Sequence, residues 1–187
     1  NTSLKMKIFI IVISVLFLVS CSHKSTLSKE FGCKSKDYPN LEKIQDFKKV
    51  FTVQYPDTWK TNLYYDKNQS SIYTADTTKQ LTETMLLDIT HVSNKLNIDA
   101  NFIKKFKSSL ANNQLLETGS GERKFKGKMA YYSNAIGKKG KFDYKIYTIF
   151  IKLNENNYIH SKIEVYGDSL ADQRICNGIN LIEKITY

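Results

Sequence analysis

The sequence has little of what enzyme sites are recognised by. Its three histidines are His23, His91 and His160, and no pair has the spacing of a helical or loop metal site. It contains no Gly-x-Ser-x-Gly elbow for a serine nucleophile. The stretch TGSGERK, residues 118–124, lacks the third glycine and the following helix of a phosphate-binding loop, so we expect an ordinary loop there. These absences predict no metal, no cofactor and no catalytic residues.

Proline and glycine are also scarce, with 2 and 8 residues in a chain of 187. No internal repeat or biased tract is visible. The chain instead has 12 tyrosines and 10 phenylalanines, beside one tryptophan. Length and composition together predict about one globular domain with a sizeable core.

The sequence has no apolar run of comfortable membrane-spanning length, which for a helix is about 20 residues. The run from Ile8 to Val19 covers 12 residues, is interrupted by Ser14 and follows Lys5 and Lys7. A short basic start followed by an apolar core of this length is typical of a secretory signal peptide. We therefore expect residues 1–20 to be a signal peptide that takes no part in the fold.

The predicted signal peptide is followed directly by a cysteine, in the order Leu18-Val19-Ser20-Cys21. These four residues resemble the lipobox of bacterial lipoproteins. The resemblance implies cleavage before Cys21, a diacylglyceryl group on its thiol and often a third acyl chain, such as palmitate, on the new amino terminus. Two or three such chains hold a protein stably on a membrane. An ordinary cleavable signal or an uncut anchor helix is the alternative.

The lipobox resemblance implies an exported protein that is lipid-anchored to the cell envelope, on the periplasmic side or at the cell surface. Residues 21–45 are polar, contain Gly32 and Pro39 and show no sustained period, so we interpret them as the lipidated N-terminus and a tether. The domain is then expected over residues 46–187.

The net charge of +10 indicates contact with a polyanion or a lysine-rich solvated surface. An exported lipoprotein rarely meets nucleic acid, so anionic lipid head groups or cell-wall polymers are better partners. Two basic clusters stand out: Arg123, Lys124, Lys126 and Lys128 form one, and Lys138, Lys139 and Lys141 form the other. If 128–137 is one strand, the clusters lie about 33 Å apart and cannot form a single anion groove.

Two cysteines, Cys33 and Cys176, remain once Cys21 is assigned to the lipid. An even number of cysteines in an oxidising compartment predicts a disulfide. This bridge would tie the start of the domain to its last helix. Two buried free thiols are the alternative.

Alternating apolar residues predict a series of strands, with one helix between the fourth and the fifth and a second helix at the end of the chain. The expected strands are 51–55, 59–65, 70–76, 85–93, 127–137, 141–153 and 157–167. Short turns join the last three, so they are antiparallel neighbours. Because 141–153 is apolar on both faces, it should be central and covered on both sides.

Each predicted helix has a proposed start. Asp99 is the expected N-cap of the first, whose apolar stripe contains Phe102, Phe106 and Leu110. A capping box, Ser169-x-x-Asp172, is expected to open the second. Gly178 inside that helix should mark a close approach to the sheet. The predicted fold class is α+β, with an antiparallel sheet of about six or seven strands covered by helices.

The opening strand and turn, Phe51-Thr52-Val53-Gln54-Tyr55-Pro56-Asp57-Thr58-Trp59, resemble the PsbP-like family, as does the terminal helix after a three-strand meander. The resemblance implies an α/β/α sandwich. It also implies a non-catalytic accessory or scaffold role in binding other proteins. It carries over no functional residues.

Three function classes remain open. The first is a binding or scaffold module for another envelope protein, which an exposed aromatic patch over a filled core would favour. A small hydrolase needs a deep cleft with converging acids, and a carrier of an apolar ligand needs an enclosed apolar cavity. His91 is expected to be buried and hydrogen-bonded, whereas His160 shares a face with Lys162 and Glu164 that should be solvated.

Overall fold

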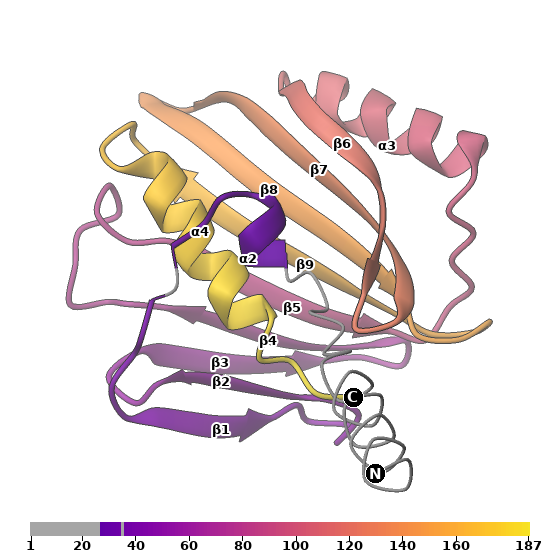
Figure 1. Cartoon of the computed structure of the whole chain (residues 1–187), viewed down its shortest axis with the longest axis horizontal. Coiled ribbons are helices and arrows are strands. Elements are labelled where there is room, and N and C mark those ends of the chain that lie inside the picture. The colour runs from indigo at the N-terminus through magenta and orange to yellow at the C-terminus, as the bar shows by residue number, and fades with distance from the viewer. Residues whose placement is uncertain (1–26, 35) are drawn as a thin grey trace, which may run out of the picture.

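The structure is a computed structural model that describes residues 27–34 and 36–187. Its helices and strands follow the order seen in Figure 1: α2 (Leu27–Glu30), β1 (Leu41–Gln45), β2 (Thr52–Pro56), β3 (Lys60–Tyr65), β4 (Gln69–Ala75), β5 (Leu86–Val92), α3 (Ala100–Asn112), β6 (Leu116–Phe125), β7 (Lys128–Lys139), β8 (Phe142–Lys152), β9 (Tyr158–Tyr166) and α4 (Ala171–Ile182). The predicted signal peptide and Cys21 lie outside the described residues.

Seven strands form one antiparallel sheet in the order β3-β4-β5-β9-β8-β7-β6, and β1 and β2 form a separate two-stranded sheet. The predicted α+β class and the strand number are therefore confirmed. The expectation of a loop at 118–124 is wrong, because these residues belong to β6. β6 lies at the edge of the sheet, where a polar, glycine-containing strand is tolerated. A β-bulge interrupts its register between Glu117 and Gly119.

The ordered domain begins earlier than residue 46, so the predicted tether is too long. Leu27 of α2 is buried in the main core, and all five residues of β1 pair with β2. Ser28 fixes α2 to α4, since its backbone N–H donates to Glu183 (2.9 Å) and its hydroxyl bonds to Asn180 (2.7 Å). Short, polar segments of this kind are ordered by tertiary contacts, and a local sequence pattern does not reveal such contacts.

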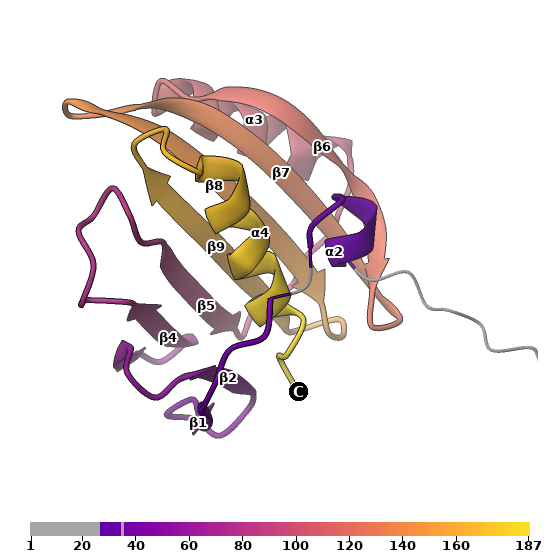
Figure 2. The same ribbon diagram turned by 60° about the vertical axis from the view of Figure 1, so that its left-hand side comes forward.

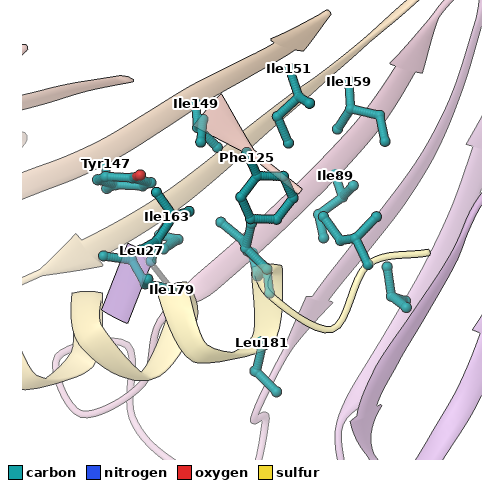
Figure 3. Packing of buried hydrophobic residues seen from close by; sticks show 14 of the residues in the cluster. Leu27, Ile89, Phe125, Tyr147, Ile149, Ile151, Ile159, Ile163, Ile179 and Leu181 are labelled. Carbon is teal, nitrogen blue, oxygen red and sulfur yellow. The ribbon is translucent and has the colours of Figure 1, made fainter. Parts of the chain in front are cut away.

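One face of the sheet packs on α4 and α2 (Figure 2). The core between them is mainly aliphatic with a few aromatic residues, and Figure 3 shows it from close by. Its fully buried members include Tyr147, Ile149 and Ile151 of β8, Ile163 of β9 and Ile179 of α4. Burying side chains of this size contributes about 1.5–3 kcal/mol each, so this core is the main source of stability.

A disulfide joins Cys33 to Cys176, as predicted, with 5.2 Å between their Cα atoms. It fixes the segment after α2 to the side of α4, across a sequence separation of 143 residues. Asn180 reinforces this contact, because its side-chain amide donates to the carbonyl of Lys34 at 3.0 Å. Closing so long a loop restricts the unfolded chain and stabilises the domain.

The opposite face of the sheet packs on α3, which lies behind β6 and β7 in Figure 2. Asp99 caps this helix as predicted, since its carboxylate accepts from the backbone N–H of Phe102 at 2.8 Å. Phe102 and Phe106 then meet Phe150 of β8 edge to face, with ring centroids 5.1 and 5.2 Å apart. β8 is therefore central and covered on both faces, as expected.

No helix among the described residues is long and apolar enough to cross a membrane.

Gly178 provides a sharp test of the packing between α4 and the sheet. A Cβ added there would lie 2.6 Å from Cδ1 of the fully buried Ile163. We expect Gly178→Ala to destabilise the domain by about 1–3 kcal/mol through overpacking, although alanine favours helix by about 1 kcal/mol. Urea unfolding measures this change.

The double variant Gly178→Ala/Ile163→Ala controls for other effects. Its loss should be smaller than the sum of the two single losses, because the small side chain at 163 makes room for the new methyl group. A stabilising Gly178→Ala would show that the close approach does not exist.

Candidate functional site

The sequence-predicted reactive residues do not come together. Cys33 and Cys176 are joined in the disulfide, so neither provides a thiolate. His91 and His160 project from opposite faces of the sheet, because the partners in register are His91 with Ile159 and Thr90 with His160. Within residues 27–34 and 36–187, no group of three or more histidine, cysteine or carboxylate side chains is placed to hold a metal ion.

His91 is buried on the face covered by α4, as predicted, but it is not fully hydrogen-bonded. Its Nδ1 has no partner among the described residues. Burial lowers the pKa of the imidazole, and Asp46 opposes this shift. His91 is therefore a neutral core residue at neutral pH.

His160 lies on the other face, and the expectation that it is solvated is wrong. Its ring stacks on Phe150, with centroids 4.3 Å apart, and Nε2 is buried without a partner in the described part of the chain. Burial, together with the positive charge of Lys162, lowers the pKa of His160 to about 4. Alternation along β9 suggested a polar face, but Phe150 of the neighbouring strand β8 covers the ring of His160.

A cleft of about 460 Å³ lies between α3 and strands β7, β8 and β9, and His160 is part of its wall. Glu164 in this cleft accepts hydrogen bonds from Lys139 (3.0 Å) and Tyr144. Burial alone would favour its protonated form, but these hydrogen bonds outweigh burial and hold the pKa of Glu164 below its ordinary value. A glycosidase-type mechanism needs one carboxyl group with a raised pKa as its acid, and Glu164 has the opposite shift.

A second, larger hollow of about 780 Å³ lies at one end of the sheet, where α4 begins. We call it the distal groove. Its apolar side chains come from Leu116, Ile136, Tyr144, Leu170 and Ala171, and charged side chains of both signs also line it. Leu116 is 67% exposed, Leu170 69% and Ile136 38%. Three large aliphatic side chains exposed in one hollow indicate a surface that binds something.

Leu170 is held in an unusual conformation at the mouth of the distal groove. It is the N-cap of α4, with φ 49° and ψ 30°, in the left-handed region. A leucine there costs about 1–2 kcal/mol. The predicted capping box is therefore wrong, since Leu170 and not Ser169 occupies the cap. Asp172 instead forms an ion pair with Lys145 of β8.

Arg174 fixes the loop that carries Leu170. Its buried guanidinium donates to the carbonyl oxygens of Thr84 (2.8 Å), Tyr166 (3.0 Å) and Gly167 (3.0 Å), and its Nε donates to that of Ser169 (3.0 Å). Guanidinium has five donors in a rigid plane, so it can satisfy several carbonyls at once. The exposed leucine therefore projects from a rigid support.

The distal groove was not predicted from the sequence. Its apolar residues come from β6, β7, β8, the loop before α4 and the first residue of α4, which are far apart in the sequence. The one local signal was Leu170 itself, an apolar residue in a polar loop. Only the strand pairing brings Leu116 opposite Ile136.

Comparison with known proteins finds neither a family model nor a curated protein that matches the sequence. Solved structures do match. The cyanobacterial PsbP (CyanoP) of Synechocystis sp. PCC 6803 superposes with a TM-score of 0.57 at 13% identity, covering 82% of this chain and 96% of that one. The Ran-binding protein Mog1p of Saccharomyces cerevisiae gives a TM-score of 0.53 at 9% identity, with 79% and 95% covered. LpqN of Mycobacterium tuberculosis, described as involved in cell envelope biogenesis, gives 0.48 at 10% identity, with 88% and 98% covered.

The chain has the fold of PsbP and Mog1. The resemblance found in the Phe51–Trp59 segment is thus confirmed for the fold. In this domain the segment forms β2 and the turn after it, and Tyr55 and Trp59 stack with centroids 6.4 Å apart. The motif is structural and provides no part of the distal groove.

The low pKa of His160 predicts that the domain loses stability in acid. The folded state holds His160 neutral down to a pKa of about 4, whereas the unfolded chain protonates near 6.5. Its contribution is fully present above pH 6.5 and is lost as the pH falls toward 4, by about 3 kcal/mol in total.

Chemical denaturation at pH 7.5, 5.5 and 4 measures this loss. The free energy of unfolding of His160→Leu should change less across this pH window than that of the wild type. His91 is present in both proteins, so its own contribution to the pH dependence cancels in the comparison. Equal acid sensitivity of the two proteins would contradict burial of His160.

Proposed function

We propose that this chain is a lipid-anchored, non-catalytic binding module of a bacterial cell envelope. In this role its distal groove binds an apolar segment of another envelope protein. The observation that carries the proposal is the exposed Leu170, which Arg174 holds in a strained conformation beside Leu116 and Ile136. Strain that a fold retains at its surface is typical of functional positions.

The distal groove has the composition of a protein-binding surface. Its lining combines apolar side chains with Lys138, Asp143, Lys145 and Asp168, which carry charges of both signs. Protein interfaces likewise combine apolar side chains with polar and charged ones. Leu116 and Leu170 are about two-thirds exposed, so the groove is open, whereas a carrier of an apolar ligand needs an enclosed cavity.

The comparisons support a binding role at the level of the fold. Mog1p is a Ran-binding protein, so at least one protein with this fold binds another protein. Identity of 9% transfers no partner, and we propose none by name. The non-catalytic part of the proposal is supported by Glu164, since a carboxylate paired with Lys139 and Tyr144 is a poor proton donor.

Photo-crosslinking in intact cells tests the distal groove. A photoreactive residue at Gln173, an exposed position on the groove wall, should form a discrete adduct with one envelope protein. The variant Leu116→Asp/Leu170→Asp should reduce this adduct at least tenfold, because central apolar side chains contribute about 2 kcal/mol or more to an interface.

Leu81→Asp is the matched control, since Leu81 is an exposed leucine outside the groove. It should leave the adduct unchanged. An adduct equally weakened by Leu81→Asp would contradict the proposal, and so would an adduct that survives Leu116→Asp/Leu170→Asp. A lipid-sized mass that stays bound in native mass spectrometry would favour the carrier instead.

The lipid anchor is tested separately. Cys21→Ser should abolish incorporation of a labelled fatty acid into the protein, because Cys21 is the thiol that the lipobox resemblance assigns to the diacylglyceryl group. Gel electrophoresis after metabolic labelling measures this. Cys33→Ala/Cys176→Ala is the control, since it removes the other two cysteines and should keep the label. Label that persists in Cys21→Ser would refute the anchor.

A further inference from the structure

The antiparallel topology divides the turns of the domain between two ends of the sheet. The register places Tyr65 opposite Ser70, Val92 opposite Tyr158 and Phe125 opposite Lys128. One end therefore collects the segments 46–50, 65–69, 92–97, 124–129, 152–157 and 183–187. We call it the basic end. The other end collects 57–60, 76–85, 113–115, 138–143 and 167–173, and it contains the distal groove.

The two ends differ in charge, although lysines look evenly scattered in the sequence. The segments of the basic end contain nine lysines and four acids. Those of the groove end contain five lysines and six acids. The predicted basic clusters are thus separated by β7, with Lys124, Lys126 and Lys128 at one end and Lys138, Lys139 and Lys141 at the other.

The charge of the basic end is not fully balanced by its own carboxylates. Lys126 donates to the backbone carbonyl of Ile185 at 2.5 Å, and Lys128 donates to that of Leu153 at 3.0 Å. Lys48 likewise donates to the carbonyl of Lys67 at 2.9 Å. These neutral acceptors orient the ammonium groups and leave their positive charge available to an anionic surface.

Exposed aromatic rings lie at the same end. Phe47 and Tyr65 are 53% and 57% exposed and stack face to face, with ring centroids 3.7 Å apart. Tyr64, the preceding residue of β3, is 58% exposed. Aromatic side chains and long lysines are the residues that favour the boundary between lipid head groups and acyl chains.

The described chain also begins at this end. Ser28, the second residue of α2, donates from its backbone N–H (2.9 Å) and its hydroxyl (2.7 Å) to the carboxylate of Glu183 in the segment 183–187, and Figure 2 shows α2 beside β6. Cys21 precedes Leu27 by six residues, which span at most about 20 Å when extended. An acylated Cys21 would therefore keep this end of the domain within about 20 Å of the bilayer.

We propose that the basic end docks on anionic lipid head groups. This inference rests on the proposed lipid anchor. It adds an orientation: the sheet stands on the bilayer by its basic end, and the distal groove faces away from it. Lysine ammonium groups bind lipid phosphates, and the stacked Phe47 and Tyr65 lie at head-group depth.

Lysine footprinting tests the docking on the lipidated protein purified from membranes. The protein is placed in vesicles of phosphatidylcholine with 30% phosphatidylglycerol, or of phosphatidylcholine alone, and treated briefly with an amine-reactive reagent. Exposed lysines of the basic end, such as Lys67, Lys95, Lys124 and Lys128, should react about fivefold more slowly on the anionic vesicles, the factor expected for one cation at such a surface. Lysines of the groove end should react equally on both, and high salt should abolish the difference.

Two matched variants separate position from net charge. Lys124→Gln/Lys128→Gln should restore fast labelling of Lys67 and Lys95, whereas Lys138→Gln/Lys141→Gln removes the same charge from the other end of β7 and should leave their protection intact. Equal protection at both ends, or none at either, would overturn the docking. If the protein proves to have no acyl group, the proposed anchor is wrong but the docking can still be tested. The same lysine footprint is then measured at low salt with the unacylated protein added to these vesicles. These lysine-labelling measurements do not depend on whether the distal groove binds a protein, so they test the docking separately from the proposed groove function.

Discussion

The burial of β8 on both faces is the constraint on which the rest of the domain depends. Tyr147, Ile149 and Ile151 point to one side, and Tyr144, Ile146 and Phe150 point to the other, and all six are buried. A strand of this kind is stable only where separate layers cover each face. α4 and α2 provide one layer and α3 provides the other (Figure 1). The disulfide and the Ser28–Asn180 contact hold the first layer in place.

The two layers cover the sheet to different extents, and this difference explains where ion pairs and the desolvated His160 lie on it. The layer of α4 and α2 lies over one large, mainly aliphatic core, whereas the clusters under α3 are smaller and include Tyr131, Phe150 and Tyr144. Beyond that helix the same face has ion pairs such as Asp88–Lys162 (3.1 Å). His160 lies at the boundary, close enough to Phe150 to be desolvated and close enough to Lys162 to disfavour a second positive charge.

Features encoded by a local period or by composition could be predicted from the sequence. They include the two apolar faces of 141–153, the Asp99 cap, the close approach at Gly178 and the pairing of Cys33 with Cys176. The predictions that were wrong concern features that depend on contacts between segments far apart in the sequence. β6 is polar and contains two glycines, yet backbone pairing with β7 keeps it in the sheet. The N-cap of α4 is Leu170 and not the predicted Ser169, because Arg174 donates to the carbonyls of the preceding residues. A four-residue capping motif does not contain this arrangement.

The distal groove and the basic end escaped prediction for the same physical reason. Both are made at strand ends, where residues far apart in the sequence meet because antiparallel strands return to the same edge. Charge that is scattered along the chain thereby becomes a difference between two ends, with nine lysines against four acids at one and five against six at the other. An anchor at Cys21 would act on the first of these ends, since the chain reaches the domain there. A groove at the second end is then held away from the bilayer, which is the position a partner in the aqueous part of the envelope requires.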